Sequence, residues 1–205
     1  MLLARRTILT AAAAFAMPLA VMPPVRAASA DPRMGERALG RADARVTAQE
    51  WFSLTCSHCA FFSVKVMPEV RTKLIDTGIL RIVYKDFPLD QVALTAAMVA
   101  RALPPDRYVP FITTLLATQD RWVFARGINP VEELRKLAFA AGMSSATFDA
   151  TVADKGLQTA ILEEQDRAAR ELKVSSTPTF IINGQRHPGA VEFDAFSRMV
   201  MAAAG

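Results

Sequence analysis

The sequence predicts an α/β fold in which a block of helices interrupts a sheet-forming domain. Residues 45–87 show strand, helix and strand character in that order, and residues 91–173 contain no convincing strand. Strand character returns at residues 179–182, where the following Asn183-Gly184 pair is a strong signal for a two-residue β-hairpin turn. These three observations predict one domain built from both ends of the chain, with a helical subdomain inserted into it.

Residues 1–30 have the composition of a signal peptide. Arg5 and Arg6 form a basic start, residues 8–21 are apolar, and residues 28–30 (Ala-Ser-Ala) match the small residues of a cleavage site. The apolar run falls short of the roughly 20 residues that a spanning helix needs, so an uncleaved membrane anchor is the less favoured alternative. The arginine pair also resembles a twin-arginine export signal. We therefore expect a periplasmic protein.

The charge balance argues against a nucleic-acid partner. The chain has 24 basic and 20 acidic residues, and the three arginines of residues 1–30 leave 21 basic against 20 acidic residues in the remainder. No basic run remains there to form a nucleic-acid footprint. A hydrophobic fraction of 52% is typical of a globular protein with a substantial core.

The strand–helix–strand unit begins at residues 45–52, a run rich in β-branched and aromatic residues. A helix is predicted to start at Cys56 and to end near Gly78, because glycine favours a helix C-cap. Pro68 lies inside the helical pattern and predicts a kink rather than a stop. Residues 79–87 form the second predicted strand. The apolar residues at helical spacing along this helix are Phe61, Phe62, Val66, Val70 and Leu74.

Helices and a hairpin complete the predicted order. The helices of the inserted block cover residues 91–103, 106–118, 130–141, 145–154 and 157–173, the returning hairpin strand covers 185–191, and the last helix covers 192–204. The predicted organisation is a signal peptide at 1–30, a flexible lead-in at 31–44, a sheet domain at 45–90 and 174–205, and an inserted helical subdomain at 91–173.

Cys56 and Cys59 are the two cysteines of the chain. A disulfide that closes so short a loop restrains the unfolded chain little, so a purely structural bridge is the less favoured alternative. Cys56 would lie at a helix N-terminus, where backbone N–H groups and the helix dipole stabilise a thiolate. Cys59 lies one turn further on, so Cys56 is predicted to react first and Cys59 to resolve the mixed disulfide. His58 lies between them and could favour the Cys56 thiolate.

Metal binding is the alternative use of this pair. Two cysteines at this spacing form half of many zinc sites, and His58 could be a third ligand. A closed site needs about four ligands, and His187 is the only other histidine, although carboxylates could complete the set. We predict no metal and no cofactor beyond the redox-active Cys56–Cys59 pair.

Two segments, EWFSLTCSHC and VSSTPTFIING, lie on either side of the helical block and together resemble the DsbA-like branch of the thioredoxin superfamily. The resemblance extends over about residues 45–204. It implies a thioredoxin fold with a helical subdomain inserted between the second strand and a cis-proline loop. It also implies that Cys56 is the nucleophile and Cys59 its buried partner, and that His58 matches the histidine of the frequent Cys-Pro-His-Cys motif.

The same resemblance assigns three residues outside the cysteine motif. Pro178 would be the cis-proline, and Thr177 before it would offer backbone hydrogen bonds to a bound peptide. Glu50 matches an acidic residue that assists proton transfer in the family, with a solvent-facing strand residue as the alternative. Ser57 departs from the family pattern, which has proline between the cysteines, so the reduction potential of the family does not transfer to this chain.

The function implied is that of an exported thiol:disulfide oxidoreductase. We expect a monomeric dithiol oxidase that introduces disulfides into thiol-containing exported proteins through Cys56 and Cys59, and that a membrane redox partner reoxidises. A disulfide reductase or isomerase on the same fold is the nearest alternative. A non-enzymatic protein that binds metal or unfolded peptides is the alternative from another class.

Overall fold

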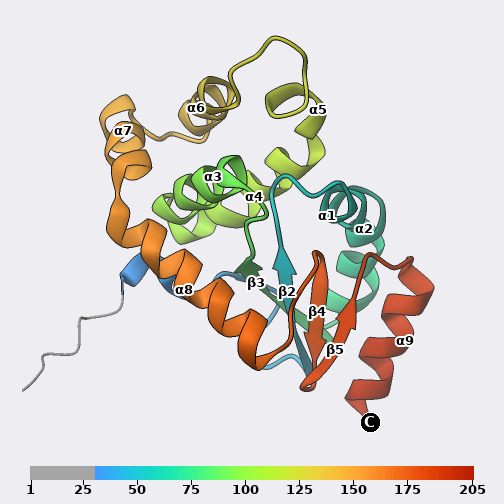
Figure 1. Cartoon of the computed structure of the whole chain (residues 1–205). Helices are drawn as coiled ribbons and strands as arrows, with labels where there is room; N and C mark the ends of the chain where they lie inside the picture. Colours follow the sequence, from blue (N-terminus) through green and yellow to red (C-terminus); the bar gives the residue numbers. More distant parts are fainter. Residues whose placement is uncertain (1–30) are drawn as a thin grey trace, which may run out of the picture.

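A five-stranded mixed sheet lies at the centre of the molecule, in the strand order β1-β3-β2-β4-β5 (Figure 1). The computed structural model describes residues 31–205, so the predicted signal peptide lies outside the described residues. The strands are β1 (Ala38–Leu39), β2 (Val46–Phe52), β3 (Leu80–Asp86), β4 (Thr179–Ile182) and β5 (Gln185–Pro188). β2 pairs parallel with β3 and antiparallel with β4, which places β2 at the middle of the sheet. This is the thioredoxin-like α/β arrangement that the sequence predicts.

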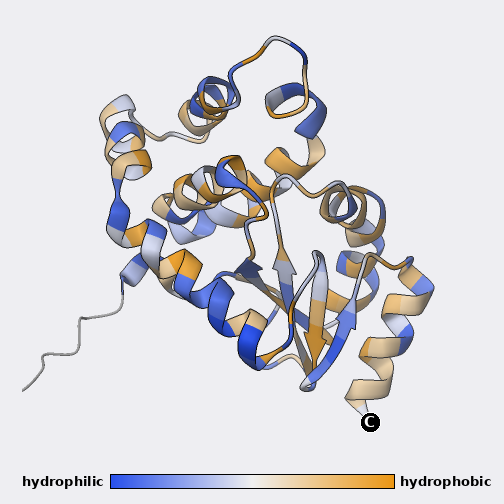
Figure 2. Cartoon of the chain, viewed as in Figure 1, coloured by the Kyte–Doolittle hydropathy of each residue, from blue (hydrophilic) through white to orange (hydrophobic). Residues whose placement is uncertain are grey.

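Two layers of helices cover the faces of this sheet (Figure 1). On one face the helix that starts after Cys56 packs with the C-terminal helix α9 (Phe193–Ala204), where the rings of Phe62, Phe180 and Phe196 lie with centroids 4.7 to 5.2 Å apart. On the other face α8 (Lys155–Glu171) covers Trp51. In Figure 2 the inner strand β4 is coloured mostly as hydrophobic and the edge strand β5 as hydrophilic, in line with their burial.

The helix after Cys56 is continuous but irregular. It runs from α1 (Ser57–Phe61) through the π-helical segment η2 (Phe62–Val66) and α2 (Met67–Val70) to a second π-helical segment, η3 (Arg71–Ile75). Pro68 is the second residue of α2, just beyond η2, so the irregularity expected at this proline takes the form of a wider helical turn. A proline lacks the N–H that a regular turn requires, and a π-helical turn is one way to accommodate it.

The inserted block consists of helices joined by loops, with no strand between residues 91 and 173. Its helices are α3 (Gln91–Ala102), α4 (Pro105–Ala117), α5 (Gln119–Trp122), α6 (Pro130–Ala140), α7 (Ser145–Ala153) and α8. The short helix α5 is absent from the sequence prediction, which assigns no element to its residues. Trp122 anchors it, because this side chain is buried and its Nε1–H donates to the carbonyl of Leu115 at 2.8 Å.

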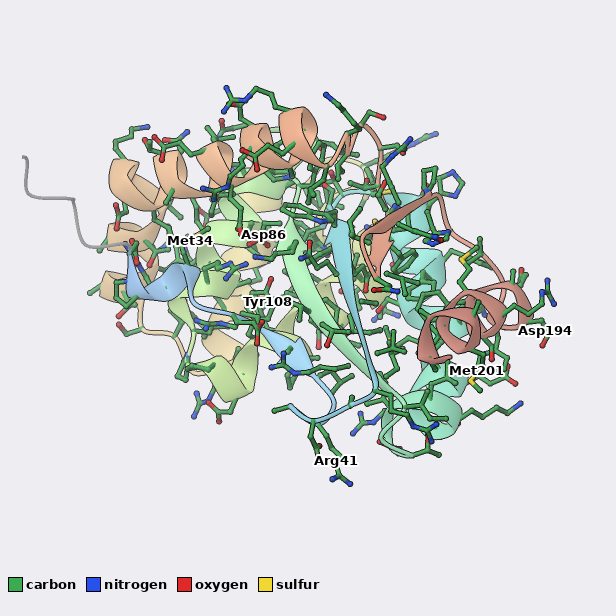
Figure 3. All side chains as sticks on the ribbon, turned by 90° about the horizontal axis from the view of Figure 1, so that it is seen from below. Met34, Arg41, Asp86, Tyr108, Asp194 and Met201 are labelled. Carbon is green, nitrogen blue, oxygen red and sulfur yellow. The ribbon has the colours of Figure 1, made fainter. Side chains whose placement is uncertain are left out.

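The segment 31–44 is not the flexible lead-in that its glycines and charges predict. It forms the short 3-10 helix η1 (Pro32–Met34) and strand β1, which pairs antiparallel with β3. The side chain of Arg101 holds this segment by donating to the carbonyl of Gly35 at 2.9 Å. Figure 3 shows Asp86 and Tyr108, two further members of this contact region, beside η1 and β1. Tertiary hydrogen bonds therefore order a stretch whose composition alone favours mobility.

Arg101 and Asp86 form a buried ion pair beneath this segment. Arg101 Nε donates to Asp86 Oδ2 at 2.5 Å, and the two side chains are only 1% and 2% exposed. The hydroxyl of Tyr108 donates to the other carboxylate oxygen at 3.2 Å. Removal of one partner from such a pair leaves an uncompensated charge in the interior, which is strongly destabilising.

Replacing Arg101 by leucine is therefore expected to lower the free energy of unfolding by about 3–5 kcal/mol. Urea unfolding of both proteins measures the difference. The double variant Asp86→Leu/Arg101→Leu should recover part of the loss, because no buried charge then remains. Lys136→Ala, which breaks the exposed pair with Glu133, serves as the control and should cost less than about 1 kcal/mol. An Arg101→Leu loss no greater than that of the control would contradict the prediction.

Candidate active site

Cys56 is the N-cap residue of α1, at the point where the chain leaves the central strand β2. Its backbone is extended and its carbonyl accepts the Ala60 N–H at 3.1 Å, which begins the helical hydrogen bonds. The residue is 8% exposed, and its side chain lies beside the loop that precedes β4. The thiol is thus set at the positive end of a helix, as the sequence predicts.

The surroundings of Cys56 stabilise its ionised form. The thiol of Cys59 donates to Cys56 Sγ and is the largest cause that lowers the pKa of Cys56, to about 5. The backbone N–H groups of His58 and Cys59 add to this effect, while partial burial opposes it. At neutral pH the group is therefore a thiolate, the reactive form of cysteine.

Cys59 is in the opposite electrostatic situation. It is completely buried, and burial raises the pKa of its thiol well above the usual value. The hydrogen bond to Cys56 raises it further, because donation requires Cys59 to keep its proton. Both cysteines are free thiols in the structure. The pair is asymmetric, with the charge on Cys56 and the proton on Cys59.

The loop before β4 faces the cysteine pair across 121 positions of sequence. The Thr177–Pro178 peptide bond is cis, and in the thiol form Cys56 Sγ donates to the carbonyl of Thr177 at 3.2 Å. The buried Thr177 hydroxyl lies close enough to Cys56 to help lower the pKa of its thiol. The structure therefore brings together the two segments on which the family resemblance depends.

His58 contributes to the site through its backbone. Its side chain is exposed, as is that of Ser57, and among the described residues no hydrogen bond joins its imidazole to Cys56. Its N–H, in contrast, helps to lower the pKa of the Cys56 thiol. The main-chain N–H of His58 thus favours the Cys56 thiolate, and a role for its imidazole stays a prediction.

Glu50 lies on β2 opposite Tyr84 of β3 and Phe180 of β4, so it is in the middle of the sheet. It is 2% exposed, which rules out the solvent-facing alternative. Burial raises the pKa of this carboxyl to about 8. Its Oε2 has no hydrogen-bond partner among the described residues, and its charge raises the pKa of Cys59. Glu50 is therefore a titratable group next to the buried cysteine.

Lys85 does not neutralise Glu50. Its ammonium binds Glu164 of α8 at 2.6 Å, on the other face of the sheet. Lys85 follows Tyr84, the residue opposite Glu50, so the alternation of side chains along the strand directs it to the other face. The carboxyl of Glu50 thus remains without a cation from the neighbouring strand position.

One residue that contacts the site is not identified from the sequence. Gln119 of α5 donates through Nε2 to the carbonyls of Leu54 and Cys56, at 2.8 and 3.1 Å. A polar residue just after an amphipathic helix has no local signal that distinguishes this role from an ordinary helix end. Only the packing of α5 against the loop after β2 reveals it.

Within residues 31–205, no three histidine, cysteine or carboxylate side chains gather in an arrangement that could hold a metal ion. In the same range no helix has both the length and the apolar character required to cross a bilayer.

Comparisons with known proteins agree with this geometry. A sequence model of the family described as Thioredoxin matches residues 33–202. The crystal structure of α-DsbA1 from Wolbachia pipientis matches with a TM-score of 0.76 at 26% identity, over 84% of this chain and 92% of that one. BdbD from Bacillus subtilis shares the fold, with a TM-score of 0.73 at 19% identity over 83% of this chain and 93% of that one.

Curated relatives match over part of their length. A protein of Rickettsia felis, provisionally named a protein-disulfide oxidoreductase, is 27% identical over 163 residues, which are 79% of this chain and 58% of that protein. A Rickettsia prowazekii protein with the same provisional name is 26% identical over 147 residues, 71% of this chain and 53% of that protein. The chain thus spans just over half the length of these relatives. The family match and the fold show that the chain belongs to the thioredoxin family, and within this family it is similar to DsbA proteins.

Proposed function

We propose that this chain is a periplasmic thiol:disulfide oxidoreductase that works as a dithiol oxidase through Cys56 and Cys59. The observation that carries the proposal is the lowered pKa of Cys56, about 5, beside a fully buried Cys59 that keeps its proton. Stabilisation of the dithiol form makes the corresponding disulfide a stronger oxidant. The arrangement therefore favours transfer of the disulfide to a substrate.

The reaction would proceed in two exchanges. A substrate thiolate attacks Cys56 Sγ of the disulfide form, the Cys56–Cys59 bond breaks, and the electron pair goes to Cys59 Sγ. Cys59 then takes up a proton, for which Glu50 is the nearby buried donor, since its pKa of about 8 keeps it protonated at neutral pH. The second substrate thiolate attacks the substrate sulfur of the mixed disulfide and releases Cys56 as a stable thiolate.

The cis-proline loop would bind the substrate backbone. Thr177 lies against Cys56 and precedes Pro178, so a peptide attached to Cys56 would extend along this loop. Phe61, one helical turn beyond Ser57, is 38% exposed and adds an apolar surface beside the motif. Substrates would be thiol-containing exported proteins, and the reduced enzyme would need a membrane redox partner to reoxidise it.

The reduction potential tests the direction of the reaction. Equilibration of the purified protein with glutathione buffers is expected to give a reduction potential of about −120 mV, in the range of strong dithiol oxidants. A reduction potential of about −270 mV would instead identify a reductase. The same preparation should convert a reduced, unfolded substrate protein to its disulfide form when supplied as the disulfide. An isomerase would leave the number of substrate disulfides constant and change only their pairing.

A further inference from the structure

The inserted helical subdomain reaches into the active-site loop through one side chain. Gln119 at the start of α5 is 6% exposed, and its Nε2 donates to the carbonyls of Leu54 and Cys56. These acceptors lie 65 and 63 positions earlier in the chain. The two hydrogen bonds therefore join elements that the sequence does not connect locally.

Both acceptors control where the reactive thiol lies. The Cys56 carbonyl also accepts the Ala60 N–H, so Gln119 fixes the residue that caps α1. Leu54 is buried, and Gln119 is the donor to its carbonyl, which would be costly to leave unpaired away from water. Together the two bonds hold the backbone of the loop on both sides of Thr55.

The position of Gln119 is itself well defined. The N–H groups of Val123 and Phe124 donate to the Gln119 carbonyl at 3.2 and 3.0 Å, which closes α5 behind it. Trp122, 1% exposed, ties this short helix to the end of α4. A side chain supported in this way can hold the loop in one place.

We propose that Gln119 is a positioning residue through which the helical subdomain maintains the reactivity of Cys56. By fixing the loop, it keeps Cys56 Sγ aligned with the N–H groups of His58 and Cys59. Its amide protons also place partial positive charge next to the Cys56 backbone. The consequence for catalysis depends on the proposed oxidase function, whereas the effect on the thiolate does not.

The variant Gln119→Met tests the inference, because methionine has a similar size and no donor. The ionisation of Cys56 in the dithiol protein is followed by the ultraviolet absorbance of its thiolate against pH. We expect the acid dissociation constant of Cys56 to fall about tenfold, the effect of losing one hydrogen bond of ordinary strength. Gln119→Glu should lower the acid dissociation constant of Cys56 at least as much, because an ionised carboxylate would repel the same two carbonyls.

Gln165→Met is the matched control. Gln165 also donates from the helical subdomain to a backbone carbonyl, that of Pro88, at 3.1 Å. The Gln165→Met variant should leave the ionisation of Cys56 unchanged, while it loses about as much stability as Gln119→Met. An unchanged titration in folded Gln119→Met would overturn the inference and leave Gln119 with a structural role only.

A second measurement uses the wild-type protein and is available if Gln119→Met does not fold. The side-chain amide protons of Gln119 should be protected from solvent exchange and should shift in NMR spectra when the cysteine pair is oxidised. Rapid exchange without a shift would overturn the inference. If the wild type fails to oxidise dithiols while Gln119→Met still shifts the titration of Cys56, the proposed oxidase function is wrong and the positioning role of Gln119 is supported.

Discussion

Replacing Cys56 by serine is expected to abolish dithiol oxidation. The serine hydroxyl is not ionised at neutral pH and cannot form the disulfide that carries the two electrons. The assay follows disulfide formation in a reduced dithiol peptide with the oxidised protein as the only oxidant, and the rate with Cys56→Ser should equal that of the buffer. Activity undiminished by the substitution would rule out the proposed mechanism.

Cys59→Ser is the matched variant, because it removes the other sulfur of the same motif. It keeps the Cys56 thiolate and its backbone donors, although without the Cys59 thiol the pKa of Cys56 should rise. This variant should not oxidise the peptide either, but it should accumulate a stable mixed disulfide with a substrate disulfide, detectable as an added mass. Cys56→Ser should form no such adduct, since its remaining thiol is completely buried and holds its proton. Equal adduct formation by the two variants would contradict the assignment of Cys56 as the nucleophile.

The second large effect is expected for Glu50→Gln, which removes the buried proton donor without changing the shape of the side chain. Positioned acids and bases contribute about 10²–10⁴-fold to a rate, so mixed-disulfide formation should slow by about 10²-fold. Stopped-flow measurement with a peptide thiol at constant thiolate concentration isolates this step. Glu164→Gln is the control, because Glu164 is also largely buried but binds Lys85 on the other face of the sheet.

The pH profile separates proton donation from a purely structural role. The pKa of Glu50 is raised to about 8, so the carboxyl can donate below that pH and loses its proton above it. The wild-type rate should therefore decline above about pH 8, and Glu50→Gln should lack this decline. A decline of the same form in Glu50→Gln would exclude Glu50 as its source.

The same shift has a consequence for stability. Because the folded pKa lies above the ordinary value of 4.5, the contribution of Glu50 to stability is fully present below pH 4.5 and is lost as the pH rises through about 8. Glu50→Gln, which cannot ionise, should gain stability relative to the wild type across this range.

Much of the fold is readable from local pattern. The β-branched and aromatic run of β2, the Asn-Gly turn after β4 and the strand-free block between β3 and β4 correspond to observed elements, with ends displaced by at most three residues. The segment 31–44 and helix α5 are the exceptions. The first is ordered by a distant contact with the Arg101 side chain, and the second by burial of Trp122 against the end of α4; neither leaves a local pattern in the sequence.

The chemistry of the site divides in the same way. Residue type and spacing alone were enough to predict two thiols at a helix start, because the helix N-terminus and the two cysteines are close in sequence. The family resemblance then favoured a redox-active pair over a metal site or a structural bridge. A lowered pKa of Cys56 was already predicted from the helix N-terminus, whereas the approach of Thr177, the buried carboxyl of Glu50 beside Cys59 and the hydrogen bonds of Gln119 needed the folded chain. Each depends on burial or on hydrogen bonds between segments far apart in sequence, and desolvation and long-range donors arise only when the sheet and the helical subdomain come together.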